Sequence, residues 1–178
     1  SEMCIRDRRH LVPFGEYVPL EQWLRGAIAF FDLPMSRNRS GPAQQTLLNM
    51  KGVSVALSIC YEVVFPDLVR SDADQAGLLV TISNDTWFGS SIGPHQHLQM
   101  ARMRALENGR YLVRATNNGL TAIVDQKGTV LGQLPQFQAS VLTGNVQPFT
   151  GITPYTRVGD MPLLLGLGLI LLIHFVRT

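Results

Sequence analysis

Two short apolar segments, each followed by polar residues and then by a helical pattern, constrain the fold of this chain most. Residues 53–59 alternate bulky with small side chains, which is typical of a β-strand with two different faces. Residues 77–83 are apolar almost throughout, as expected of a strand covered on both faces. Helical patterns begin near Pro66 and span residues 94–108. The alternation predicts an α/β sheet with helices on both faces.

The remaining elements are predicted from periodicity and turn residues. Apolar residues recur at helical spacing over residues 20–31, which predicts an amphipathic helix. Gly109 is expected to end the helix over residues 94–108 as its C-cap. Turn residues then separate four further expected strands, at residues 111–115, 121–124, 129–133 and 140–145.

A run of apolar residues lies at 161–176, with His174 as its single polar residue. As a helix these residues would measure about 24 Å, against about 30 Å of bilayer hydrocarbon. Because His174 and Arg177 could snorkel to the interface, we expect a transmembrane helix. A buried core helix is the alternative that the length favours. We expect residues 163–175 to form a continuous helix that projects from the α/β body.

Composition and cysteine usage exclude several classes of function. The formal net charge is +2, without a basic cluster interleaved with aromatic residues, so no nucleic-acid surface is expected. Cys4 and Cys60 are too few for a disulfide framework or a cysteine-based zinc site. His95 and His97 are two residues apart and would point to different faces of a helix. We therefore predict no metal and no cofactor.

Cys60 and Glu16 are the candidates for nucleophilic and proton-transfer chemistry. Cys60 ends a predicted strand just before a helix, where the helix dipole lowers a thiol pKa. The alternative is a small buried apolar residue. Glu16 lies among apolar residues, where desolvation would raise its pKa and suit proton transfer. The alternative is an exposed loop glutamate.

Polar and aromatic residues follow the second strand directly, at positions 84–88. Asn84 and Asp85 could close an Asx-turn, and Trp87 could form an apolar lip with Phe88. The alternative is a tight turn with two core aromatic residues. Residues 1–8 show no period of strand or helix and resemble translated sequencing-adapter sequence, so we treat them as a non-native leader.

Five short motifs occur in a fixed order along the chain. They are HLVPFGE at residues 10–16, ICYE at 59–62, SNDTWFG at 83–89, RALENGR at 104–110 and ATNNG at 115–119. Together they resemble the apolipoprotein N-acyltransferase family of the nitrilase, or carbon-nitrogen hydrolase, superfamily. The resemblance covers roughly residues 10–178. It implies the C-terminal half of a nitrilase-like α-β-β-α sandwich at residues 9–150, a linker at 151–160 and a transmembrane helix at 161–178.

The resemblance also implies a reaction and a set of site residues. Cys60 matches the family nucleophile, which takes an acyl chain from a phospholipid as a thioester. The amine of a diacylglyceryl-modified apolipoprotein then accepts this acyl chain. Glu16 matches a second essential glutamate. Tyr61 and Glu62 would shape the site, with supporting roles for Asn84, Asp85 and Trp87.

The chain departs from the family pattern at one position, because Arg8 stands where the family has a lysine. The catalytic glutamate of the family lies upstream of the matching region. We therefore expect the chain by itself to be inactive. The resemblance implies a monomer in the bacterial inner membrane, with its catalytic domain on the periplasmic side. A membrane-tethered carbon-nitrogen hydrolase and an inactive membrane-anchored remnant remain as alternatives.

Overall fold

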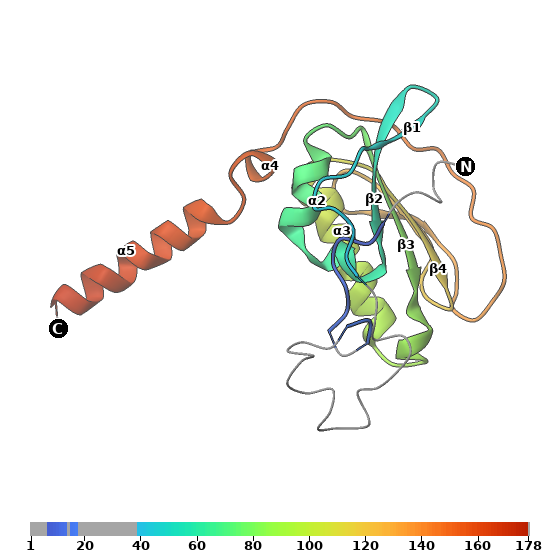
Figure 1. Cartoon of the computed structure of the whole chain (residues 1–178), viewed down its shortest axis with the longest axis horizontal. Helices are drawn as coiled ribbons and strands as arrows, with labels where there is room; N and C mark the ends of the chain where they lie inside the picture. The colour runs from blue at the N-terminus through green and yellow to red at the C-terminus, as the bar shows by residue number, and fades with distance from the viewer. Residues whose placement is uncertain (1–6, 14, 18–38, 178) are drawn as a thin grey trace.

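A computed structural model describes residues 7–13, 15–17 and 39–177, and a mixed β-sheet dominates this part of the chain (Figure 1). Its strands lie in the order β1-β2-β3-β4-β5-β6. The pairs β2·β3 and β3·β4 are parallel, and the other neighbouring pairs are antiparallel. The strands are β1 Leu48–Met50, β2 Val53–Ile59, β3 Leu78–Asn84, β4 Leu112–Asn117, β5 Ala122–Val124 and β6 Val130–Gln133. The mixed sheet confirms the predicted α/β class.

Helices connect the parallel strands and cover one face of the sheet. They are η4 Cys60–Val64, α2 Pro66–Ala73, η5 Asp85–Phe88, α3 Gly93–Asn108, α4 Pro154–Val158 and α5 Met161–Arg177. Figure 1 shows α2 and α3 together against one side of the strands, and both helices contribute to the same buried cluster. Pro66 stands at the start of α2 and Gly109 ends α3 with φ of 60°, as predicted.

The alternation in β2 explains how the sheet separates two cores. Ala56 faces the cluster shared with α2 and α3, where a small side chain lets the helices approach the sheet. Val55 and Leu57 face a second cluster on the opposite side. Val146 packs against that second cluster, and the Phe149 ring stacks on Tyr111 with centroids 6.0 Å apart. Among the described residues an extended segment, and not a helix, packs on the second face, so the prediction of helices on both faces is wrong for this part of the chain.

The structure differs from the predicted secondary structure at two places. Residues 140–145 are not a strand, because this segment runs without a ladder partner and leaves Val141 84% exposed. Strand β1 was missed; it pairs with β2 through Lys51 and Gly52, whose φ values of 52° and 85° suit a tight hairpin turn. The helix predicted over residues 20–31 lies outside the described residues.

Helix α5 is continuous and projects from the sheet, as predicted (Figure 1). It has 17 residues, none of them buried. At 1.5 Å per residue it is roughly 26 Å long, which is shorter than a typical bilayer core. In the part of the chain that the structure describes, no helix has both the length and the apolarity to cross a membrane. The prediction of a transmembrane helix at 161–178 is therefore not supported.

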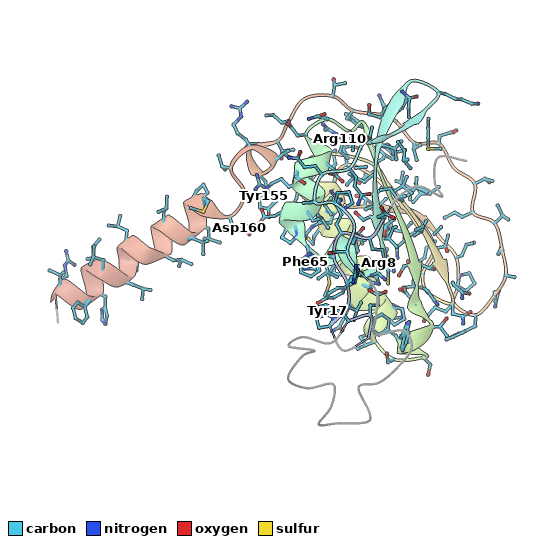
Figure 2. All side chains as sticks on the ribbon, in the orientation of Figure 1. Arg8, Tyr17, Phe65, Arg110, Tyr155 and Asp160 are labelled. Atoms are coloured by element: carbon cyan, nitrogen blue, oxygen red, sulfur yellow. The ribbon has the colours of Figure 1, made fainter. Side chains whose placement is uncertain are left out.

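The junction between the body and α5 is tied to the far end of α3. Thr153 donates its hydroxyl to the Glu107 carbonyl, and the Thr156 hydroxyl donates to Asn108 Oδ1 at 3.1 Å. Arg110, labelled with Tyr155 in Figure 2, donates to carbonyl groups that include Ala76 at 2.6 Å and Gly151. These hydrogen bonds connect the α4 segment with the end of α3 and with the residues that follow α2.

Candidate functional site

Cys60 lies at the turn between β2 and η4, at the C-terminal end of a parallel strand. Its thiol is free and half-buried. Its φ is 54°, in the left-handed region that non-glycine residues rarely adopt. Such a conformation costs about 1–3 kcal/mol and is found chiefly where the surrounding structure fixes it, often at functional sites. The sequence placed Cys60 at a strand end but gave no sign of this backbone conformation.

Glu62 fixes the turn that carries Cys60. Its side chain is 0% exposed, and its carboxylate accepts the backbone N–H of Ile59 at 2.8 Å. The same carboxylate accepts the backbone N–H groups of Arg9 and His10, the latter at 3.3 Å. A buried carboxylate is costly without such donors. Glu62 thus joins the end of β2 to the segment of residues 8–10.

Arg8, in that segment, forms an ion pair with Glu16. The other carboxylate oxygen of Glu16 accepts the Val12 backbone N–H at 2.9 Å. Because Arg9 follows Arg8 and binds Glu62, the pair lies beside the turn that carries Cys60. Glu16 is therefore a paired carboxylate and not an exposed loop residue. The family resemblance further predicts that Glu16 lies directly beside the Cys60 thiol, and its contacts with Arg8 and Val12 do not test this.

Two contacts fasten the N-terminal segment to the body, and neither was predicted. The Arg9 guanidinium donates twice to the Asp72 carboxylate in α2, at 2.9 and 2.6 Å. The His10 ring lies 3.7 Å from the Phe65 ring, between centroids. Figure 2 labels Arg8 and Phe65 on this flank of the molecule. A bidentate pair of this kind fixes the relative orientation of the two side chains as well as the distance between them.

Asp85 is the centre of a buried charged network behind Cys60. It is 1% exposed and accepts the Ser83 hydroxyl at 2.6 Å and an Arg114 N–H at 2.7 Å. Its other partner is His97 Nδ1 at 3.0 Å. Burial alone would raise the pKa of Asp85, but hydrogen bonds from His97 and Ser83 and the Arg114 charge together lower it. Asp85 is therefore an ionised, fully paired carboxylate.

His97 connects this network to Cys60, because its Nε2 lies 3.2 Å from the Cys60 carbonyl oxygen. Sequence reasoning considered His97 only as a metal ligand and assigned no role to Arg114. One signal was available: Arg114 interrupts an apolar strand pattern, and a buried arginine needs a carboxylate partner. Burial lowers the pKa of Arg114, and the charge of Asp85 opposes this shift.

The other predicted residues surround the same edge of the sheet. Asn84 Oδ1 accepts the Thr86 backbone N–H at 3.2 Å, which confirms the predicted Asx-turn. Trp87 is 73% exposed, so it is not a core residue and remains available as part of an apolar lip. The Tyr61 ring meets Phe65 edge-on, with centroids 4.9 Å apart.

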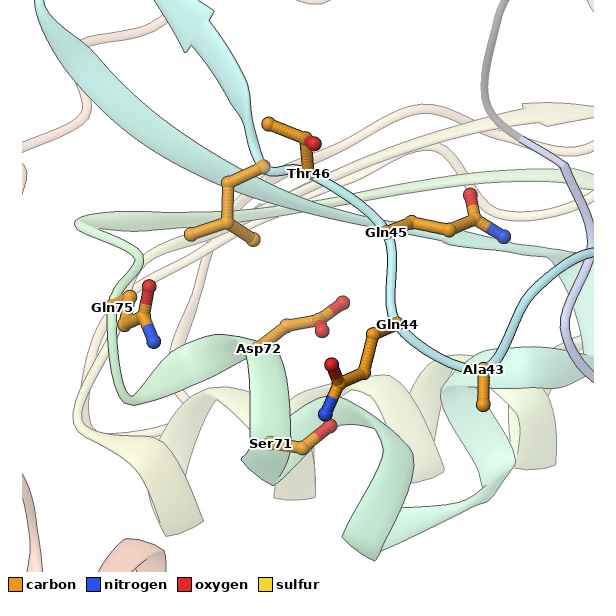
Figure 3. A pocket seen from close by; sticks show the side chains of 8 residues that line it. Ala43, Gln44, Gln45, Thr46, Ser71, Asp72 and Gln75 are labelled. Carbon is orange, nitrogen blue, oxygen red and sulfur yellow. The ribbon is translucent and has the colours of Figure 1, made fainter.

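A polar pocket of about 420 Å³ lies elsewhere, between α2 and the segment that leads into β1 (Figure 3). Its lining residues are Ala43, Gln44, Gln45, Thr46, Leu47, Ser71, Asp72 and Gln75. None of the predicted site residues lines it. Within residues 7–13, 15–17 and 39–177, no group of three or more His, Cys, Asp or Glu side chains is arranged to hold a metal ion.

Comparison with known proteins gives a consistent family pattern. The family model described as carbon-nitrogen hydrolase matches residues 2–153. The apolipoprotein N-acyltransferases of Pseudomonas aeruginosa and Azotobacter vinelandii are 56% and 58% identical to this chain over 165 residues. That of Haemophilus influenzae is 52% identical over 169 residues. These alignments cover 93–94% of this chain but 32% of each relative, so the chain spans about a third of their length.

Solved structures show a similar fold at lower identity. The C. elegans NitFhit protein has a TM-score of 0.55 and 23% identity, covering 72% of this chain and 31% of that chain. A carbon-nitrogen hydrolase from Helicobacter pylori G27 has a TM-score of 0.50 and 15% identity, covering 55% and 41%. Both similarities show that the fold is shared, and nothing beyond the fold.

Proposed function

Because this chain belongs to the carbon-nitrogen hydrolase family, we propose that it carries the nucleophile of an apolipoprotein N-acyltransferase, and that this nucleophile is Cys60. The observation that supports this best is the strained turn at Cys60, with φ of 54°, at the end of β2. The high identity to relatives named apolipoprotein N-acyltransferase supports the transferase over other members of the family.

The proposed reaction has two acyl transfers. The Cys60 thiolate attacks an ester carbonyl of a phospholipid; the carbon–oxygen bond breaks, and a lysophospholipid leaves with a proton. The amine of a diacylglyceryl-modified apolipoprotein then attacks the thioester, the carbon–sulfur bond breaks, and an amide forms while the amine proton passes to the released Cys60 thiolate. A thiol suits this sequence because the thioester divides one difficult transfer into two easier ones.

The surrounding residues would have distinct roles. Glu62 would keep the Cys60 turn in place through its bonds to Ile59 and the N-terminal segment. The backbone N–H of Tyr61, next to the nucleophile, would donate to the oxyanion of the tetrahedral intermediate. Glu16 would act beside the thiol, paired with Arg8 at the family lysine position. Arginine keeps the positive charge there but does not release a proton.

The proposal includes the environment of the reaction. The substrates would come from a bacterial inner membrane, with the catalytic domain on the periplasmic side. The apolar surface of α5 and the exposed Trp87 and Phe88 would face lipid. The protein would act as a monomer without a cofactor. Residues 9–150 would be the catalytic portion and 151–160 a linker to the C-terminal helix.

The decisive experiment is mass spectrometry of Cys60 after incubation with phospholipid vesicles. The longest product of the gene that contains this segment should gain an acyl group on Cys60, and alkaline hydroxylamine should release it. Cys60→Ala should abolish the adduct. His95→Leu, at an exposed position of α3, is the control variant and should retain it. Absence of the adduct from the longer protein would refute the proposal.

Two further measurements separate the transferase from its alternatives. The 178-residue chain alone, with or without Arg8→Lys, should show no adduct, because the proposed general base lies upstream of it. In the longer protein the thioester should accumulate until an amine acceptor is added. Rapid loss of the acyl group to water without acceptor would instead indicate a carbon-nitrogen hydrolase type of reaction.

A further inference from the structure

We propose that His97 is a positioning residue that aims the oxyanion donor next to Cys60. The inference rests on the proposed role of Cys60 as nucleophile. His97 lies in the first turns of α3 and is buried, with the Phe88 ring edge-on at 6.2 Å between centroids. Its two ring nitrogens contact two different parts of the site: Nδ1 meets Asp85, and Nε2 meets the Cys60 carbonyl oxygen.

The partners of His97 decide which ring nitrogen carries a proton. The Cys60 carbonyl can only accept, so Nε2 must be protonated to form the 3.2 Å bond. Nδ1 lies 3.0 Å from an Asp85 oxygen and 3.1 Å from an Arg114 nitrogen. If Nδ1 accepts from the guanidinium, the neutral ring carries its proton on Nε2; if Nδ1 donates to the carboxylate, the ring donates from both nitrogens as an imidazolium. The donor role of Nε2 therefore follows from its contact with the Cys60 carbonyl, and Asp85 and Arg114 hold the ring in place through Nδ1.

The bond to Cys60 has a geometric consequence for the next residue. The Cys60 carbonyl and the Tyr61 N–H belong to the same planar peptide, and the described residues contain no cis peptide bonds. In a trans peptide the two groups point in opposite directions. When His97 fixes the carbonyl on one side, it also fixes the Tyr61 N–H on the other. That N–H is the donor proposed to bind the oxyanion.

The same bond stabilises an otherwise unfavourable backbone. Cys60 has φ of 54°, a conformation that persists only when its surroundings determine it. Glu62 fixes the residue before Cys60, through the Ile59 N–H at 2.8 Å, and His97 fixes the carbonyl after it. The turn is thus fixed on both sides of the nucleophile. His97 thus adds a side-chain restraint to the Cys60–Tyr61 peptide, beyond the backbone geometry of η4.

The test compares two reactions of the Cys60 thiol in the 178-residue chain with Cys4→Ser. Acetylation by p-nitrophenyl acetate passes through a tetrahedral oxyanion, whereas alkylation by iodoacetamide does not. His97→Leu should lower the acetylation rate at least tenfold, as expected for the loss of an oriented oxyanion donor. It should change the alkylation rate less than about threefold. Because neither reagent is a phospholipid, the result does not depend on the acyltransferase proposal.

Two matched variants complete the test. His97→Gln keeps an N–H donor and should restore the ratio of acetylation to alkylation to within about threefold of the parent. His95→Leu changes an exposed histidine on the same helix and should leave both rates unchanged. An unchanged ratio in His97→Leu would overturn the proposal. A ratio in His97→Gln as low as that in His97→Leu would also overturn it. If the longer gene product reacts normally with p-nitrophenyl acetate but forms no thioester with phospholipid, only the proposed function is refuted.

Discussion

Replacing Asp85 with asparagine removes one charge from the buried network while changing the shape of the side chain little. Asp85 is 1% exposed and Arg114 is fully buried, so the variant leaves the guanidinium without its carboxylate. Removal of one partner from a buried pair costs about 3–5 kcal/mol of unfolding free energy. For a domain of this size that corresponds to a fall in Tm of roughly 6–20 °C.

A surface ion pair provides the matched control. Asp67 is paired with Arg70, but its side chain is 76% exposed. Pairs of this kind contribute at most about 1 kcal/mol, so Asp67→Asn should lower Tm by no more than about 4 °C. Thermal unfolding followed by circular dichroism at pH 7 measures both variants. If Asp85→Asn lowers Tm no more than Asp67→Asn does, the buried network is refuted as a source of stability.

The pH dependence of the Tm difference between the parent and Asp85→Asn is a second check. The pKa of Asp85 is lower in the folded protein than its ordinary value of 3.8, so the unfolded chain binds the proton first. The stabilisation from Asp85 is therefore complete above the ordinary pKa and is lost as pH falls through the lowered one. The Tm difference between the parent and Asp85→Asn should be constant from pH 7 to 5 and shrink below pH 4. A constant difference down to pH 2.5 would contradict the ionised state of Asp85.

Three other substitutions test the packing around Asp85 and the absence of a strand at residues 140–145. Gly119→Ala should lower the unfolding free energy by about 1–3 kcal/mol, because its new Cβ would lie 2.8 Å from Asp85 Cβ. The control Gly166→Ala, with open space around it in α5, should raise helix stability by about 0.5–1 kcal/mol. Val141→Lys should change stability by less than about 0.5 kcal/mol, since Val141 is 84% exposed; a larger loss would indicate the strand pairing that the structure lacks.

Local sequence patterns predicted the elements whose structure depends on nearby residues. Alternation defined β2, a proline began α2, and Gly109 ended α3, since each signal acts within a few residues. Residues 140–145 have a strand-like composition but no partner strand in the structure. A ladder needs hydrogen bonds to another segment, and composition alone does not supply them. Strand β1 has three residues, too few to produce a recognisable period.

The residues of the candidate site also fall into those that local sequence patterns identify and those that only the fold brings into the site. Cys60, Glu62 and Asp85 lie in short motifs that were recognisable along the chain. Their partners come from distant positions: Arg114 is 29 residues from Asp85, and His97 is 37 residues from Cys60. These side chains meet because β2, β3 and β4 are parallel neighbours whose C-terminal ends lie at one edge of the sheet. No spacing rule along the sequence relates residues that meet through sheet order.

Helix α3 has a mechanical consequence for the molecule, because its two ends are fixed to different parts of it. Its first turns contact Cys60 through His97, and its last residues, Glu107 and Asn108, bind the threonines of the α4 segment. A helix of 16 residues is stiff over its length of about 24 Å. Tilting of α4 relative to the sheet must therefore either break the bonds at Thr153 and Thr156 or transmit force along α3 to the nucleophile turn.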